Sequence, residues 1–453
     1  MSLPEKFTER MKLLLKDKYF LFEKAFENKA FRALRINTLK CDGSVIKENF
    51  SLKNATVFCE NSYYLPDSVQ KPGNNPLHHA GAYYLQEPSA SAVVEAIGIA
   101  NGDFVLDLCA SPGGKSTQAA AKLNGTGVLL SNEFVGSRVG ALVSNIERMG
   151  ISNAVVTSAR PDVLCQQLTE VFDKVIVDAP CSGEGMFRKE TAALENWSVE
   201  NVLSCAERQK KILKSAARCV KPGGKIVYST CTYAFEENEG VIADFLKNYP
   251  DFHLVKPEIS FGEHAIAEFA PDVDNIQFAR RIFNFNGGEG HFVAVMQRDG
   301  EPYKSTLEYC SKLDKKSMDI NKIFQAFFND NFTDEAPKNL QIIGDKVYIV
   351  PYDFKLSGVQ IARSGIFAGT VRNNRFVPEH ALFNNVIFNA RSVIDLKLDD
   401  DRVLQFLHGE EIVCDSSLRG YTQVKIEGIP LGFGKASNGT LKNHYPKGLR
   451  ILK

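Results

Sequence analysis

The sequence lacks the features that mark membrane, secreted or uniformly basic proteins. It contains no uninterrupted apolar run long enough to span a bilayer. Its first ten residues are charged and include no apolar core of a signal peptide. Its formal net charge is zero, which argues against an indiscriminate polycation but permits local clusters of one sign. These absences predict a cytoplasmic protein with no membrane segment.

Closely spaced cysteine pairs are also missing. The closest two of the ten cysteines are twelve residues apart, so there is no C-x-x-C pair and no metal site is predicted. A disulfide framework is not expected in a chain of 453 residues without a secretory signal. Most of the cysteines should be buried small apolar residues, and one or two should be reactive. They lie at positions 41, 59, 109, 165, 181, 205, 219, 231, 310 and 414.

The length predicts several domains, because a single core stops growing at roughly 250–300 residues. A small α+β module is expected at 1–76, where the turn formers KPGNNP (71–76) end it. A larger domain should follow at 77–299, then an intermediate domain at 300–395 and a basic tail at 396–453. Within 421–453 the tail has a single acid, Glu427, against six cations, which are Lys425, Lys435, Lys442, Lys447, Arg450 and Lys453.

The larger domain alternates buried strands with amphipathic helices. Strands are expected at 104–110, 127–133, 154–159, 172–180 and 223–232, with helices between them such as 137–150 and 206–220. This alternation predicts an α/β fold, a mostly parallel sheet with helices on both faces. Ligands bind such sheets at the carboxyl ends of the strands. The motifs described next all follow strand ends.

The first motif is DLCASPGGKS (107–116), in which Pro112, Gly113 and Gly114 stand between a strand and a helix. Glycines let a ligand approach the backbone, and a helix N-terminus offers free N–H groups. A P-loop is excluded, because it needs a glycine where Cys109 stands. The motif alone also fits an ordinary tight turn. Glu133 ends the next strand, about twenty residues on, where an acid can accept hydrogen bonds from ribose hydroxyls.

Two cysteines follow the last two expected strands. Asp178 and Cys181 lie in VDAPCSGEG (177–185), and Cys231 lies in STCT (229–232). Because both segments end at one edge of the sheet, the two thiols are expected to face a common pocket. A thiol near backbone N–H groups can be partly ionised and nucleophilic. The alternative is that both cysteines are simply buried.

Together these segments resemble the RNA (cytosine-5) methyltransferase family. The resemblance covers roughly residues 30–300 and also includes LRINTLK (34–40), GAYYLQEPSA (81–90) and GEGHFVAV (288–295). The tail, with LGFGKASNGTLKNHYPKGLR, resembles the PUA-like RNA-binding C-terminal module of the bacterial small-subunit rRNA methyltransferase F subgroup. The resemblance implies a Rossmann-like domain that uses S-adenosylmethionine to methylate carbon 5 of cytosine in RNA. The expected partner is 16S rRNA or the small ribosomal subunit, and the expected state is a monomer.

The family's site residues carry over to matching positions. Cys231 is implied as the nucleophile, Cys181 as the second catalytic cysteine and Asp178 as a group near both base and cofactor. The implied cofactor-binding residues are Cys109, Ala110, Ser111, Pro112, Gly113, Gly114, Lys115, Glu133, Arg138 and Asp178.

The sequence departs from the subgroup at Arg160, where relatives often have an Asp that can hydrogen-bond adenine. Three other interpretations remain open at this point. The same chemistry could act on tRNA. Cys181 could be the nucleophile, as in DNA cytosine-5 methyltransferases, although Cys231 then has no role. The chain could also be a non-catalytic RNA-binding assembly factor.

Overall fold

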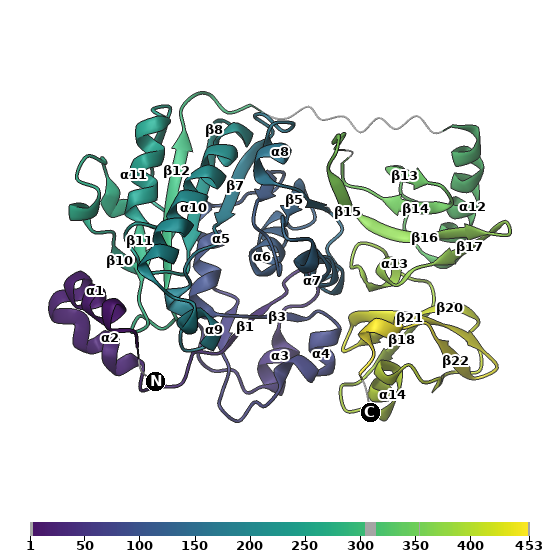
Figure 1. The fold of residues 1–453 in the computed structure, drawn as a ribbon. Helices are drawn as coiled ribbons and strands as arrows, with labels where there is room; N and C mark the ends of the chain where they lie inside the picture. Colours follow the sequence, from purple (N-terminus) through teal and green to yellow (C-terminus); the bar gives the residue numbers. More distant parts are fainter. Residues whose placement is uncertain (1–2, 304–313, 353, 452–453) are drawn as a thin grey trace.

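A ten-stranded mixed sheet forms the centre of the molecule (Figure 1). The computed structural model describes residues 3–303, 314–352 and 354–451. Five strands in the order β8-β7-β4-β5-β6 are parallel, and the order reverses between β4 and β7. These strands are β4 (Phe104–Asp107), β5 (Val128–Asn132), β6 (Ala154–Ser158), β7 (Phe172–Asp178) and β8 (Val220–Thr230).

Antiparallel strands extend this sheet on both edges. On the β8 side follow β12 (His291–Arg298), β11 (Arg280–Ile282) and β10 (Glu263–His264), and β9 (Phe252–Leu254) pairs with β12. On the other edge β15 (Gln360–Ser364) pairs with β6. A strand from the segment after residue 300 therefore completes the central sheet.

Helices cover both faces of the sheet. One apolar layer is shared with α5 (Ala92–Ile97), α6 (Gly114–Leu123) and α7 (Gly136–Arg148). The other is shared with α8 (Pro161–Cys165), α10 (Val199–Cys219) and α11 (Glu239–Asn248), and the short α9 (Thr191–Glu195) precedes α10. The predicted Rossmann-like α/β class is confirmed.

The N-terminal module begins with two helices, which precede a small sheet. These helices are α1 (Glu5–Leu15) and α2 (Tyr19–Ala25), and the sheet has the order β2-β1-β3. Its strands are β1 (Ala33–Ile36), β2 (Ser62–Tyr64) and β3 (Tyr83–Gln86), with α3 (Ser44–Asn49) and α4 (Pro76–His79) between them.

Two further sheets follow residue 314. The first comprises β13 (Leu340–Ile343), β14 (Lys346–Ile349), β16 (Ile366–Arg372) and β17 (Arg375–Pro378), with α12 (Lys315–Asn331) and α13 (His380–Asn384) beside it. The second, in the tail, comprises β18 (Val393–Leu396), β19 (Ile412–Val413), β20 (Gly420–Ile426), β21 (Ile429–Ser437) and β22 (Thr440–Asn443), with α14 (Asp401–His408). The tail shares one apolar core with the N-terminal module, because Leu34 and Phe50 belong to the same buried cluster as Phe406 and Leu431.

The cysteines are free wherever the structure describes them, and Cys310 lies outside those residues, as does Lys453. Within the described ranges no cluster of three or more His, Cys, Asp or Glu side chains could hold a metal ion. No described helix is long and apolar enough to cross a membrane.

Candidate active site

A cavity of about 1240 Å³ opens at the carboxyl ends of the parallel strands. It lies at the reversal of strand order between β4 and β7, where open α/β sheets bind ligands. Of the residues expected from the sequence to bind or react, all but Gly113 line this cavity. They are Cys109, Ala110, Ser111, Pro112, Gly114, Lys115, Glu133, Arg138, Asp178, Cys181 and Cys231.

Gly113 shapes the turn between β4 and α6. Its φ of +110° lies in the left-handed region, which favours glycine. A Cβ at this position would also come within 3.2 Å of Leu142 on α7. The Gly113 N–H donates to the Ala110 carbonyl at 2.7 Å, and the Ala110 N–H donates to the Asn132 carbonyl at 2.8 Å. The turn is thus tied to the end of β5, and its backbone forms one wall of the cavity.

Asp107 places an unsatisfied acceptor in the cavity wall. Its Oδ2 accepts a hydrogen bond from Ser116 Oγ at 2.7 Å, whereas its buried Oδ1 has no partner among the described residues. Burial raises the pKa of Asp107 to about 7. A buried acceptor without a donor is costly unless a ligand supplies the missing hydrogen bond.

Glu133 and Arg138 join the second strand to the glycine turn. The Glu133 carboxylate is buried, and it accepts a hydrogen bond from the Val135 N–H at 2.8 Å. Arg138 Nη1 lies 3.6 Å from Glu133 Oε2, while Arg138 Nη2 donates to the Ser111 carbonyl at 2.7 Å. The Arg138 side chain, which is about half exposed, thus connects Glu133 to the glycine turn.

Arg160, the departure from the expected acid, lines the same cavity. Its guanidinium forms a two-pronged ion pair with Asp162, with distances of 3.1 and 2.9 Å. Asp162 therefore offers a carboxylate two residues beyond Arg160 in the cavity wall.

The two thiols of Cys181 and Cys231 meet at the ends of β7 and β8. Their Sγ atoms are 3.3 Å apart, and the Cys231 N–H donates to Cys181 Sγ at 3.3 Å. The hydrogen bond to Cys231, burial and the charge of Cys231 raise the pKa of Cys181 well above its ordinary value. The two sulfur atoms are thus in direct contact at one edge of the cavity.

Asp178 lies beside these thiols as a carboxylate. Lys115 Nζ donates to its Oδ2 at 2.7 Å, and Ser229 Oγ donates to its Oδ1 at 2.7 Å. Burial raises the pKa of Asp178, but the charges of Lys115 and His291 and these hydrogen bonds outweigh it and hold the pKa below its ordinary value. The cavity thus holds a paired carboxylate next to an ionisable thiol.

Comparison with known proteins assigns this arrangement to a family. The family model described as 16S rRNA methyltransferase RsmB/F matches residues 94–297. Ribosomal RNA small subunit methyltransferase F of Shewanella sp. (strain MR-4) is 31% identical over 443 residues, which is 92% of this chain and 90% of that protein. The protein of that name from Vibrio vulnificus (strain YJ016) is 30% identical and covers 99% of this chain and 97% of its own length.

The chain belongs to the 16S rRNA methyltransferase RsmB/F family. Its flanking regions match models specific to methyltransferase RsmF: the N-terminal domain at 3–88, the first C-terminal domain at 326–384 and the PUA domain at 393–451. The resemblance seen in the sequence is confirmed. The protein is an RNA methyltransferase, and its cofactor is S-adenosylmethionine.

Solved structures agree with this assignment. A methyltransferase homolog protein from Pyrococcus horikoshii superposes with a TM-score of 0.58 at 26% identity, covering 65% of this chain and 95% of its own. NSun6 from the same organism, solved with SFG, gives a TM-score of 0.58 at 18% identity, covering 66% and 99%, and supports the fold alone.

Several residues of the family site were not predicted from the sequence. Glu237 holds the Cys181 turn, because its carboxylate accepts the Ser182 N–H at 3.0 Å and Gln209 Nε2 at 2.7 Å. Burial raises the pKa of Glu237 to about 7. From β1, Arg35 donates to the Gly114 carbonyl at 3.1 Å and so fixes the glycine turn. Both residues lie in segments that carry the family resemblance, which was the available signal.

A row of cations on α10 forms another wall of the cavity and was also missed. The four side chains are Arg208, Lys211, Lys214 and Arg218, all of them exposed. Spacings of three, three and four residues place them on one face of the helix. Within the described part of the chain none of the four forms an ion pair, whereas Lys210 on the same helix pairs with Glu207 at 2.7 Å. The cavity rim is therefore positively charged along α10.

Proposed function

We propose that the protein methylates carbon 5 of a cytosine in the 16S rRNA of the small ribosomal subunit, in the cytoplasm, through a covalent bond to Cys231. The observation that carries the proposal is the pair of thiols, 3.3 Å apart, at the mouth of a cavity that also holds the Lys115–Asp178 pair. Two adjacent thiols suit a reaction that needs both a nucleophile and a proton acceptor.

Carbon 5 of cytosine is a poor nucleophile until carbon 6 is attacked. When the Cys231 thiolate forms a bond to carbon 6, electron density moves to carbon 5, which can then accept a methyl group. S-adenosylmethionine, when bound, supplies that methyl group as an electrophile on its sulfonium. Removal of the carbon 5 proton then restores the ring double bond and breaks the sulfur–carbon bond. Covalent catalysis thus replaces one difficult step with easier ones.

The position of Cys181 fits this sequence. Its Sγ lies 3.3 Å from Cys231 Sγ, and the hydrogen bond to Cys231, burial and the charge of Cys231 raise the pKa of Cys181. Bonding of Cys231 to carbon 6 removes that hydrogen bond and that charge. Cys181 can then release its own proton to solvent in the cavity, and its thiolate takes the proton from carbon 5. Asp178, kept ionised by Lys115, can accept a hydrogen bond from the base.

The cavity walls fit the cofactor. The glycine turn lets a ligand approach the backbone, the buried Glu133 carboxylate can accept hydrogen bonds from ribose hydroxyls, and Asp107 Oδ1 awaits a donor. The target base must leave its stack to reach Cys231, so the substrate is a single-stranded or unstacked region.

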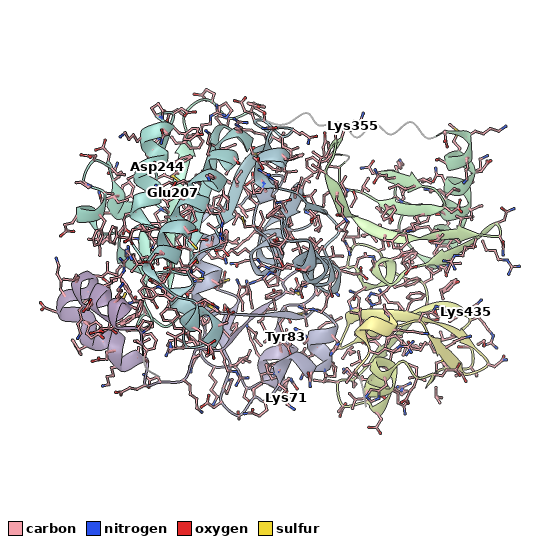
Figure 2. The ribbon with its side chains drawn as sticks, viewed as in Figure 1. Lys71, Tyr83, Glu207, Asp244, Lys355 and Lys435 are labelled. Carbon is pink, nitrogen blue, oxygen red and sulfur yellow. The ribbon has the colours of Figure 1, made fainter. Side chains whose placement is uncertain are left out.

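The rRNA assignment rests on the family and on the distribution of charge. The cations of α10 line the cavity rim, and Figure 2 shows Lys435 in the tail on the opposite side of the molecule from Glu207 on α10. An RNA that contacts both regions must be extended. The same site would act on a tRNA cytosine, and the family match favours 16S rRNA over it. The raised pKa of Cys181 disfavours it as the nucleophile, and the intact pair of thiols disfavours a purely non-catalytic assembly factor.

Bisulfite mapping of 16S rRNA and tRNA from cells with and without the gene tests this proposal. We expect one or more 16S rRNA cytosines to lose protection when the gene is deleted and to regain it with the wild-type gene but not with Cys231→Ala. If protection is lost only in tRNA, the substrate is tRNA rather than 16S rRNA. If protection is lost in neither RNA, the proposal is refuted.

A further inference from the structure

His291 is the first residue of β12, at the end of that strand that reaches the cavity. Phe292 pairs with Thr230, the residue that precedes Cys231, and both His291 and Cys231 line the cavity. The His291 side chain is 4% exposed. The imidazole therefore borders the same cavity as Cys231, which the target base must enter.

The hydrogen bonds of His291 fix which ring nitrogen carries the proton. Ser89 Oγ donates to Glu87 Oε2 at 2.5 Å, so this hydroxyl has used its hydrogen. Ser89 Oγ lies 3.0 Å from His291 Nδ1, and Glu87 Oε2 lies 3.5 Å from the same nitrogen. Towards the ring, Ser89 Oγ and Glu87 Oε2 can therefore act only as hydrogen-bond acceptors. Nδ1 must then be the nitrogen that carries the proton.

Glu87 is itself held in place by the backbone. Its carboxylate accepts the N–H groups of Glu289 and Ala90, each at 2.8 Å. Glu289 immediately precedes Gly290 and His291, so the same loop that carries the histidine also anchors its acidic partner. The orientation of the ring is therefore determined before any ligand enters the cavity.

The other nitrogen, Nε2, is left with a lone pair. Burial and the charge of Lys115 lower the pKa of His291, which favours the neutral ring. Within the described residues no protein donor reaches Nε2. The site thus presents a fixed hydrogen-bond acceptor in the cavity that Cys231 also lines.

We propose that His291 Nε2 accepts a hydrogen bond from the 4-amino group of the target cytosine and thereby selects cytosine over uracil. Cytosine carries a donor at position 4, whereas uracil carries an acceptor there that would face the lone pair of Nε2. A site built around a substrate N–H rejects analogues that lack it, because its own polar group is then left unpaired. This assignment rests on the proposed function and adds a specificity-determining residue to it.

The test measures how tightly the full-length protein binds RNA. All variants also carry Cys231→Ala, so that no covalent bond contributes to the affinity. Three RNAs carry cytosine, uracil or pyrimidin-2-one, which lacks the amino group, at the position mapped by bisulfite sequencing. With His291 present, we expect pyrimidin-2-one to bind about five- to tenfold more weakly than cytosine, and uracil more weakly still. With His291→Phe, the cytosine and pyrimidin-2-one RNAs should bind equally.

Two further variants keep the result interpretable. His291→Gln retains an acceptor and should preserve part of the discrimination, and Ser89→Ala should reduce it by freeing the orientation of the ring. The inference is overturned if the protein distinguishes the cytosine, uracil and pyrimidin-2-one RNAs equally well with His291 intact, with His291→Phe and with Ser89→Ala. Methylation of the mapped cytosine by the wild-type protein would still leave the proposed function standing. If the wild-type protein methylates no RNA, the proposed function itself fails.

Discussion

At the scale of single residues, the two thiols have different surroundings although they touch each other. Cys181 Sγ accepts the Cys231 N–H and lies 3.3 Å from Cys231 Sγ, and the hydrogen bond to Cys231, burial and the charge of Cys231 raise the pKa of Cys181. In the proposed mechanism Cys231 attacks carbon 6 and Cys181 removes the carbon 5 proton later. Sequence motifs placed both thiols in one pocket, but they contain no information on the surroundings of each sulfur.

This division of labour predicts different outcomes for the two alanine variants. Cys181→Ala should still attack carbon 6 and accept the methyl group, then stall, because the proton on carbon 5 cannot leave. A denaturing gel should show a slow-migrating protein–RNA species for Cys181→Ala and none for the Cys181→Ala/Cys231→Ala double variant. A trapped species in Cys231→Ala alone would reverse the roles.

Glu133 provides the second prediction at this scale. Glu133→Ala removes a charged acceptor from the cavity, and a charge-assisted hydrogen bond contributes about 1.5–3 kcal/mol. Affinity for S-adenosylmethionine should therefore fall by roughly tenfold or more in calorimetry. Glu133→Gln is the matched control, because its amide oxygen can still accept the Val135 N–H, and it should lose less. Unchanged affinity in Glu133→Ala would remove this carboxylate from the cofactor site.

At the scale of elements, hydrophobic pattern predicted the five parallel strands within a few residues of their bounds. Each of them is largely buried and has apolar residues at its centre, so its local sequence matches its environment. The partner of the antiparallel β15 was not predictable, since three of its five residues are exposed and give no alternating pattern. Pairing with β6 depends on where the preceding chain returns to the sheet.

The same reasoning explains which parts of the site were found. The glycine turn, Glu133, Asp178 and the thiols follow strand ends, and that position is visible in the sequence. His291 and the cations of α10 lie on elements whose contribution depends on how β12 and α10 are placed around the cavity.

The α10 row supplies an element-scale prediction. Replacing Arg208, Lys211, Lys214 and Arg218 by Gln should weaken RNA binding most at low salt. The logarithm of the RNA-binding constant falls with the logarithm of the salt concentration, and this slope should become less steep by about 0.7 for each single-strand phosphate contact that is lost. Cofactor affinity should stay close to wild type. Lys210→Gln is the matched control, because that lysine pairs with Glu207 and does not line the cavity. Equal salt slopes for all variants would contradict a role in phosphate binding.

At the scale of the whole molecule, the tail is not an independent appendage. Its core is continuous with that of the N-terminal module, and the buried Lys40 donates to the Ala80 carbonyl, Asn384 Oδ1 and the Pro430 carbonyl at 2.8, 2.9 and 3.2 Å. One ammonium thus joins the N-terminal module, α13 and the start of β21. Deleting residues from about 396 would expose the N-terminal core, so surface substitutions such as Lys435→Gln or Lys442→Gln are the better test of RNA binding by the tail.

A second junction connects the catalytic sheet to the tail through Glu147 on α7. Its carboxylate pairs with Arg363 of β15 at 2.9 Å and with His380 of α13 at 3.1 Å, and the other ring nitrogen of His380 lies 3.0 Å from the Leu431 carbonyl. Burial raises the pKa of Glu147, but the hydrogen bond to His380 and the charge of Arg363 outweigh it and lower the pKa to about 2. The junction is therefore sensitive to acid.

The sign of this pH dependence follows from linkage. Since folding depresses the pKa of Glu147, its contribution is present above the unfolded pKa of about 4.5 and is lost as the pH falls towards 2. The shift corresponds to about 3 kcal/mol at neutral pH. Urea unfolding should show Glu147→Gln destabilised at pH 7 and the difference from wild type shrinking below pH 4.5. Glu207→Gln, in an exposed ion pair on α10, should change little at any pH. A Glu147→Gln protein as stable as wild type at pH 7 would mean that the apolar contacts, rather than this ion cluster, hold the catalytic sheet against the C-terminal part of the chain.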